Sequence, residues 1–369
     1  MGKKKILLVA PPVIPTSKDS VAGTEQMIYL LGKGLTEEGH DVSTVARDDS
    51  KVYGKLISGG FCNFEFNPKA ELDQFYQVMA HTASVVRRHI RDNPDLDAII
   101  DRTCQGLSLY VGHEENGPPV LACLNMPPEY FLAPPFFEYI REKLMQRNDQ
   151  FVSVSECLAE DYKARLNFKG LESRMNVVHN GIITDDFTFS ENHEGYLLYL
   201  GRITKDKSPH LAIQAAKDTG NRIVVAGGSI DSKNSDYIDD TYFGEEIRPL
   251  LNSSVEWFGP ADLQQKVELY GNAKAVIFPS LWSEAFGLVP IEAMACGTPV
   301  IAFNRGGPKE TIRDGETGFL VEDYAQMVEA VSRVEAIDRS KCRAHVLSNF
   351  SYLTCTKNYL KIIDGLGSK

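Results

Sequence analysis

Apolar runs of strand length alternate along this chain with amphipathic segments of helix length. The first run, 4–10, is continuously apolar after its two lysines, which is typical of a strand covered on both faces. In the segment that follows, Met27, Leu31 and Leu35 recur at helical spacing. Gly39 stands where that helix would end. Because repeated strand–helix alternation builds βαβ units, we expect an α/β fold with parallel sheets.

The same pattern predicts the other elements. Further strands are expected at 42–46, 98–100, 120–124, 151–154, 176–178, 196–200, 222–226, 255–258, 275–278, 299–303 and 318–321. Helices are expected at about 23–38, 70–92, 135–148, 156–166, 209–218, 241–250, 262–270, 288–296 and 350–363.

One polar stretch, 179–194, separates two such series. Asn180-Gly181 is a turn signal within it, and acidic residues surround that turn. A chain of 369 residues suits two domains, because one domain commonly has ~100–200 residues. We therefore expect an N-terminal domain over 1–187 and a C-terminal domain over 188–349, followed by a last amphipathic helix.

The composition of the chain limits the kinds of partner that the protein can bind and the cellular compartment in which we expect it. The net charge of −11 argues against a nucleic-acid partner, whose phosphates require a basic face, but it leaves small phosphorylated ligands open. Seven scattered cysteines without a Cys-x-x-Cys pair predict neither a disulfide framework nor a zinc site. The apolar run at 6–10 is too short for a signal peptide, and no run approaches the ~18 apolar residues of a membrane span. We expect a cytoplasmic protein and leave peripheral membrane contact open.

The stretch 278–302 carries the strongest chemical signal. A predicted strand ends at Phe278, and Pro290 suits the first turn of the next helix. The loop between them presents backbone N–H groups at a helix start, where anions bind. Glu284 and Glu292 flank this region, and their carboxylates can accept hydrogen bonds from sugar or ribose hydroxyls. An isolated glutamate would more often be a solvated residue or a partner of the helix dipole, but the pair favours a binding site.

A second signal follows the predicted strand 196–200. This strand brings Gly201 and Arg202 to its carboxyl end, which is where open α/β sheets bind ligands. Lys207 comes shortly before the next predicted helix. Arginine binds phosphate through two parallel contacts and lysine binds it as a point charge, so the two could hold a diphosphate. The alternative is a solvated basic turn.

Together, these stretches resemble the family 4 glycosyltransferases of the GT-B fold. The matching motifs are Gly201-Arg202 with Lys207, Glu284-x7-Glu292, 177–181, 306–310, and 23–25 with 39–42. The resemblance covers nearly the whole chain and is strongest over 195–325. It implies two Rossmann-like, doubly wound parallel-sheet domains facing across a cleft, with a C-terminal helix, about 350–369, packing back on the first domain.

The resemblance also implies an activity. Such enzymes transfer a sugar, with retention of anomeric configuration, from a nucleotide-sugar bound by the C-terminal domain to an acceptor in the N-terminal domain. They use no metal and no cofactor, since the nucleotide-sugar is a substrate. We expect transfer of a hexosyl unit from a nucleoside diphosphate sugar, most often UDP-linked. The acceptor would be a hydroxyl of a sugar, a lipid-linked glycan or a small natural product, and the oligomeric state stays open.

If the roles known in the family are carried over residue by residue, Arg202 and Lys207 would bind the diphosphate of the donor. Their charge would stabilise the negative charge that builds on the leaving group, in place of a divalent metal. Gly201 lies beside Arg202 in the same motif and is also expected at the donor. Gly23 would let the first loop of the N-terminal domain approach the phosphates.

Most of the remaining donor contacts belong to the Glu284-x7-Glu292 motif. Glu292 would bind the ribose hydroxyls, and Glu284 would hold the donor sugar. Backbone groups next to Glu284 would assist it, and these belong to Phe286, Gly287 and Leu288. Phe258 would lie beside the nucleotide base.

Three positions depart from the family pattern. The first loop has Ala22 before Gly23, where two glycines are common. Asn125 stands after a predicted strand where family members often have a histidine facing the donor sugar, and Asp101 stands where a second histidine is often found. We include Asn125 among the catalytic candidates. The changes at Asn125 and Asp101 leave open which group handles the proton of the acceptor.

Other interpretations are retained or excluded by specific residues. A nucleotide-sugar epimerase or phosphorylase of the same fold, and a non-catalytic nucleotide-sugar-binding module, remain alternatives. An NAD-dependent oxidoreductase would need Gly-x-Gly-x-x-Gly after the first strand, but residues 10–15 read Ala-Pro-Pro-Val-Ile-Pro. Asp95-Leu-Asp97 has an Asp-x-Asp spacing, but it precedes a strand, so we interpret it as solvated charge and expect no metal site.

Overall fold

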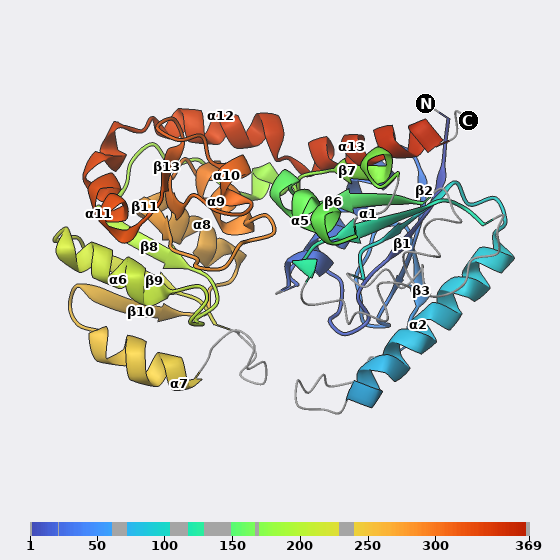
Figure 1. Cartoon of the computed structure of the whole chain (residues 1–369), viewed down its shortest axis with the longest axis horizontal. Coiled ribbons are helices and arrows are strands. Elements are labelled where there is room, and N and C mark those ends of the chain that lie inside the picture. Colours follow the sequence, from blue (N-terminus) through green and yellow to red (C-terminus); the bar gives the residue numbers. More distant parts are fainter. Residues whose placement is uncertain are drawn as a thin grey trace. The chain divides into compact units, whose positions relative to one another are not determined.

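The computed structural model describes residues 2–20, 22–60, 72–103, 117–128, 149–166, 170–228 and 240–366. They form two compact units. Unit 1 consists of Met1–Gly181 with Tyr352–Lys369, and unit 2 consists of Ile182–Ser351 (Figure 1).

Unit 1 is built on a parallel sheet of seven strands in the order β3-β2-β1-β4-β5-β6-β7. Its strands are β1 (Lys5–Val9), β2 (Asp41–Ala46), β3 (Lys55–Ser58), β4 (Ala98–Asp101), β5 (Val120–Leu124), β6 (Gln150–Ser153) and β7 (Met175–Val177). Its helices are α1 (Gly23–Glu37), α2 (Leu72–Asp92), α5 (Glu156–Leu166), the short 3-10 helix η2 (Glu172–Arg174) and α13 (Tyr352–Leu366).

The last helix of the chain, α13, packs on α1 within unit 1. The two helices approach so closely at Gly34 that a Cβ there would lie 2.1 Å from the Thr356 hydroxyl. At the edge of this contact, the Lys33 ammonium donates to the Tyr352 hydroxyl at 3.0 Å. A glycine at position 34 is therefore what lets the C-terminal helix reach its place.

Unit 2 is built on a parallel sheet of six strands in the order β10-β9-β8-β11-β12-β13. Its strands are β8 (Tyr196–Leu200), β9 (Ile223–Ala226), β10 (Val255–Gly259), β11 (Ala273–Phe278), β12 (Val300–Phe303) and β13 (Gly318–Val321). Its helices are α6 (Pro209–Asp218), α7 (Asp240–Tyr242), α8 (Leu263–Asn272), α9 (Leu288–Ala295), α10 (Pro308–Thr311), α11 (Tyr324–Arg333) and α12 (Arg339–Asn349). Shorter segments are η3 (Thr184–Asp186), η5 (Phe243–Ile247), η6 (Arg248–Leu250) and η7 (Val334–Ala336).

The strand order makes both units doubly wound. In each sheet the first three strands of the unit proceed toward one edge and the later strands proceed toward the other. In unit 2 the direction changes between β8 and β11, and in unit 1 it changes between β1 and β4. Ligands of such sheets bind outside the carboxyl ends of the strands at this switch point. The expected α/β class with parallel, doubly wound sheets is confirmed.

Several sequence expectations differ from the structure. Residues 182–187, expected in the first domain, belong to unit 2, because the Ile182 N–H donates to the Phe350 carbonyl at 2.9 Å and Arg343 donates to the Phe187 carbonyl. The single helix expected at 241–250 is divided into α7, η5 and η6, in a segment that contains a glycine and a proline. The helix expected at 135–148 lies outside the described residues. None of the helices in the described ranges is long and apolar enough to cross a bilayer.

Candidate active site

Arg202 lies in the loop after β8, at the switch point of unit 2. Its guanidinium is 3.4 Å from the Asp206 carboxylate, and both side chains are about 40% exposed. The Arg202 carbonyl accepts a 2.6 Å hydrogen bond from the Tyr199 hydroxyl. Burial raises the pKa of Tyr199 well above its ordinary value, so this hydroxyl stays a donor. The backbone of Arg202 is thus fixed while its cationic end reaches solvent.

Lys207 in the same loop forms an ion pair with Glu284, which lies in the loop between β11 and α9. The two residues are 77 positions apart in the sequence. Only 13% of the Lys207 side chain and 15% of the Glu284 side chain are exposed. The main-chain N–H of Leu281 also donates to the Asp206 carbonyl at 2.9 Å, so the two loops are joined at a second point. The ends of the two switch-point strands therefore present one shared charged site.

Gly306 and Gly307 fix the backbone of the Glu284 loop. The Gly307 N–H donates to the Glu284 carbonyl at 2.7 Å. A Cβ on Gly307 would lie 2.3 Å from the Phe286 backbone, and one on Gly306 would lie 2.5 Å from the Glu284 carbonyl. Gly306 also has a φ of +62°, which favours glycine. The sequence analysis used this Gly-Gly pair only as a motif and did not predict its supporting role.

The helix α9 begins at Leu288, shortly after Glu284 and Phe286. Phe286 is buried, with its ring 5.9 Å from that of Phe350, and Gly287 has a φ of +92°. Gly287 precedes the first helical residue, Leu288, and has no capping side chain. The backbone N–H groups of this first turn are thus available for a ligand at the site.

Glu292 lies inside α9 and is buried, with 8% of its surface exposed. The Tyr270 hydroxyl donates to its Oε2 at 2.8 Å. Burial, together with the nearby Glu292 charge, raises the pKa of Tyr270 well above its ordinary value. Glu292 is therefore held in one orientation by a neutral donor, a contact that the sequence analysis did not anticipate.

Glycines also shape the neighbouring strand ends. Gly227 follows β9 with a φ of +155°, and a Cβ there would lie 1.8 Å from the Gly201 carbonyl. The Gly227 N–H donates to the Gly259 carbonyl at 2.9 Å, and the Gly201 N–H donates to the Ala226 carbonyl at 3.1 Å. Phe258, beside Gly259, is 37% exposed. The role of Gly227 was missed, although consecutive glycines after a predicted strand were a usable signal.

Two predicted site residues lie in unit 1, apart from this cluster along the chain. Gly23 is the first residue of α1. Asn125 follows β5, and its Nδ2 is 3.5 Å from the Arg102 carbonyl. Asp101 ends β4 and accepts hydrogen bonds from the Thr103 N–H at 2.9 Å and the Thr103 hydroxyl at 2.7 Å. The Asp101 carboxylate thus closes a local turn.

Arg102 is a charged residue of unit 1 that the sequence analysis missed. Only 1% of the residue is exposed. Its buried guanidinium donates hydrogen bonds to the Tyr359 hydroxyl at 2.9 Å and to the Asn180 side chain at 3.2 Å. Burial raises the pKa of nearby Glu25 to about 7, while the positive charge of Arg102 acts in the opposite direction. An arginine at the carboxyl end of a predicted strand, as also at Arg202, was the available signal.

The Asp-x-Asp sequence before β4 has a structural place. The ammonium group of Lys5 pairs with Asp95, and the main-chain N–H of Lys5 donates to Asp97 at 2.7 Å. These contacts fix the start of β1 against the start of β4. Within the described ranges, no group of three or more His, Cys, Asp or Glu residues is arranged to hold a metal ion.

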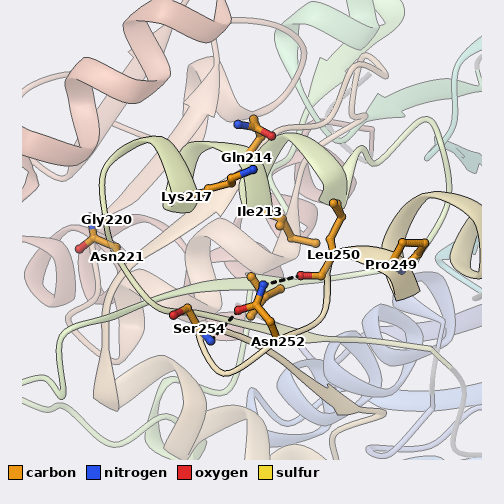
Figure 2. A pocket seen from close by; sticks show the side chains of 10 residues that line it. Ile213, Gln214, Lys217, Gly220, Asn221, Pro249, Leu250, Asn252 and Ser254 are labelled. Carbon is orange, nitrogen blue, oxygen red and sulfur yellow. Dashed lines mark hydrogen bonds between the residues drawn. The ribbon is translucent and has the colours of Figure 1, made fainter.

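A cavity of about 380 Å³ lies in unit 2 (Figure 2). It is lined by the end of α6, by η6 and by the turns that lead into β9 and β10; Lys217, Asn221 and Asn252 are among its residues. These turns are at the amino ends of the strands, whereas Arg202 and Gly259 are at carboxyl ends. The cavity therefore does not belong to the candidate active site.

Family and sequence comparisons agree with this arrangement. The family model described as "Glycosyltransferase Family 4" matches residues 21–186, and the model described as "Glycosyl transferases group 1" matches residues 184–347. The D-inositol 3-phosphate glycosyltransferase of Mycolicibacterium smegmatis is 29% identical over 236 residues, covering 59% of this chain and 53% of that protein. Its counterpart in Mycobacterium tuberculosis is 34% identical over 164 residues, covering 41% and 34%. The chain thus spans about half the length, or less, of these curated relatives.

Solved structures match over almost the whole chain. A sucrose-phosphate synthase from Thermosynechococcus elongatus has a TM-score of 0.77 at 18% identity, covering 99% of this chain and 100% of that one. Anabaena HepE in complex with UDP and glucose has a TM-score of 0.70 at 18% identity, covering 99% and 100%. The catalytic domain of Arabidopsis thaliana starch synthase IV bound to ADP and acarbose has a TM-score of 0.73 at 14% identity, covering 100% of both chains. With two parallel-sheet units, matching family descriptions and these structural neighbours, the chain belongs to the family 4 glycosyltransferases and has their GT-B fold.

Proposed function

We propose that this protein is a retaining glycosyltransferase that moves a hexosyl unit from a nucleoside diphosphate sugar, with UDP as the first candidate nucleotide, to an acceptor hydroxyl. The observation that carries the proposal is the cluster of Arg202, Lys207, Glu284 and the start of α9 at the switch point of unit 2. It combines two cations for a diphosphate with a carboxylate that can accept hydrogen bonds from sugar hydroxyls.

The chemistry follows from the charge of the leaving group. Cleaving the bond between sugar and phosphate places negative charge on the departing diphosphate. Arg202 and Lys207 would stabilise that charge directly, and the N–H groups at Gly287 and Leu288 would add oriented dipoles. Glu284 would orient the sugar through its hydroxyls. In this proposal the cations do the work of a divalent metal, so activity should persist in excess EDTA.

The comparisons support a choice of first substrates. UDP and glucose are named with the Anabaena neighbour, and ADP with the Arabidopsis neighbour. The sequence relatives are named for D-inositol 3-phosphate. We therefore propose UDP-, ADP- and GDP-sugars as donors, and inositol phosphate as the first acceptor beside sugars, lipid-linked glycans and small natural products.

The test is a transfer assay with this donor panel and acceptor panel, followed by NMR of the new glycosidic bond. We expect nucleoside diphosphate release that depends on the acceptor, and a product with the anomeric configuration of the donor. Inversion would contradict the retaining mechanism. An altered sugar without transfer would support an epimerase, phosphate-dependent turnover would support a phosphorylase, and tight binding without turnover would support a binding module.

A further inference from the structure

Both cations assigned to the donor diphosphate already have a carboxylate partner in this structure. Lys207 pairs with Glu284, and Arg202 pairs with Asp206. We propose that Glu284 serves as the resting counter-ion of Lys207, and that this pairing makes the site prefer a nucleoside diphosphate sugar over the free nucleoside diphosphate. The inference rests on the proposed function and concerns how the same site distinguishes substrate from product.

The two ion pairs differ in their surroundings. The Lys207–Glu284 pair joins two loops and is mostly buried, with 13% and 15% of the side chains exposed. The Arg202–Asp206 pair lies within one loop at i,i+4 spacing, with 40% and 39% exposed. Water screens an exposed pair and solvates either partner when they separate. Separating the buried pair leaves a poorly hydrated charge, which is strongly unfavourable.

Glu284 also cannot leave the site together with its loop. Its carbonyl accepts a hydrogen bond from the Gly307 N–H at 2.7 Å. Gly306 packs against the Glu284 backbone, and Gly307 packs against the Phe286 backbone, more closely than any side chain would allow. When a phosphate takes Lys207, the Glu284 carboxylate must therefore stay nearby. It then needs a new hydrogen-bond donor.

The sugar of the donor supplies that replacement. Its hydroxyls donate to Glu284 while the diphosphate binds Lys207, so both members of the pair exchange one partner for another. A free nucleoside diphosphate offers no such donor, so it takes Lys207 from Glu284 and leaves the carboxylate without a replacement partner. After transfer, Glu284 returns to Lys207 and favours release of the nucleoside diphosphate.

The test is calorimetric titration of UDP and UDP-glucose, without acceptor, into the wild-type protein, Glu284→Gln and Asp206→Asn. ADP and GDP with their glucose forms replace UDP if they bind the wild type more tightly. Glu284→Gln should bind the free diphosphate about 10-fold more tightly, or about 1.4 kcal/mol, and the sugar nucleotide more weakly. Asp206→Asn is the matched control, because it removes the exposed counter-ion. It should change both affinities by a similar factor, less than about 3-fold.

A second measurement separates pairing from simple repulsion. In a Lys207→Gln background, Glu284→Gln should tighten binding of the free diphosphate by less than about 3-fold, because the pair no longer exists. A Glu284→Gln protein that binds the free diphosphate with unchanged or weaker affinity would overturn the inference while leaving the proposed function intact. A wild-type protein that binds no nucleotide would overturn both.

Discussion

Arg102 donates from Nη1 to the hydroxyl of Tyr359 at 2.9 Å, joining two residues 257 positions apart in the sequence. Arg102 follows β4, and Tyr359 lies on the last helix, α13. Arg102 also donates to Asn180, which precedes Gly181, the last residue of unit 1 before the chain enters unit 2. One buried guanidinium thus binds both the segment that leaves unit 1 and the helix that returns to it.

Tyr359→Phe should destabilise the protein by about 1–3 kcal/mol, because it leaves a buried charged donor one hydrogen bond short. Thermal and urea unfolding measure this change. The matched control is Tyr352→Phe on the same helix. Its hydroxyl contacts the partly exposed Lys33 and the exposed Glu37 and should contribute less than about 1 kcal/mol. Equal effects of the two substitutions would show that the buried Arg102 contact has no special importance for stability.

Glu25 should make the stability depend on pH. Its pKa is about 7 in the folded protein, above its ordinary value of 4.5, because it is buried. The folded state therefore favours the protonated carboxyl, and the stability present below pH 4.5 declines as the pH rises through about 7. From the pKa difference, the decline is at most roughly 3 kcal/mol.

Glu25→Gln should remove this decline. The measurement is the unfolding free energy from pH 4.5 to 8, taken as the difference between wild type and variant. Glu38→Gln, at an exposed position beside the end of α1, is the control and should follow the wild type. If the curve of Glu25→Gln stays parallel to that of the wild type, Glu25 does not titrate in this range.

Arg202→Ala and Lys207→Ala should each lower the turnover number about 100-fold or more with the fold intact. Each removes charge stabilisation in the transition state, for which roughly 2.7–4 kcal/mol is typical of one lost donor in an oxyanion site. Steady-state kinetics with a saturating donor measures the loss, and circular dichroism checks the fold. Unchanged turnover in both variants would show that neither cation stabilises the leaving group.

Glu292→Gln should raise the Michaelis constant for the donor more than it lowers turnover. A ribose contact is made equally in the ground and transition states, so its loss weakens binding without raising the chemical barrier. Tyr270→Phe removes the hydroxyl that orients Glu292 and should produce a smaller change in the same direction. A fall in turnover with an unchanged Michaelis constant would place Glu292 at the reacting sugar instead.

Ser208 should tolerate glycine better than alanine. It has a φ of +53°, and no other non-glycine residue in the described ranges has a positive φ. Its hydroxyl donates to the Lys205 carbonyl at 2.8 Å. Alanine would keep the left-handed strain of about 1–2 kcal/mol and lose the hydrogen bond, whereas glycine would lose the bond but relieve the strain. Melting temperatures of the two variants give the answer, and a more stable alanine variant would contradict it.

The sequence by itself determined the class of fold and most strands. A strand that is buried on both faces of its sheet has a continuous run of apolar residues, as in β1. This signal lies within a few neighbouring residues, so it can be recognised without knowledge of the fold. The short strand β3 was missed because its pattern is only partly buried, and α12 was missed because few of its residues are apolar. The helix α11 had a signal in the sequence, because the apolar residues Met327 and Val331 are one helical turn apart and Asp323 can cap a helix start. In the structure both apolar residues are buried, and the Asp323 side chain accepts a hydrogen bond from the Gln326 N–H.

For the candidate site, the residues could be found from the sequence but their contacts could not. The sequence alone pointed to Arg202, Lys207, Glu284 and Glu292, because each lies beside or within a predictable element. It could not reveal that Lys207 pairs with Glu284, that Tyr270 orients Glu292, or that Arg102 is bound by Tyr359. These partners are distant along the chain. The order of strands in each sheet and the packing of helices on it bring them together, and local periodicity carries no information about either.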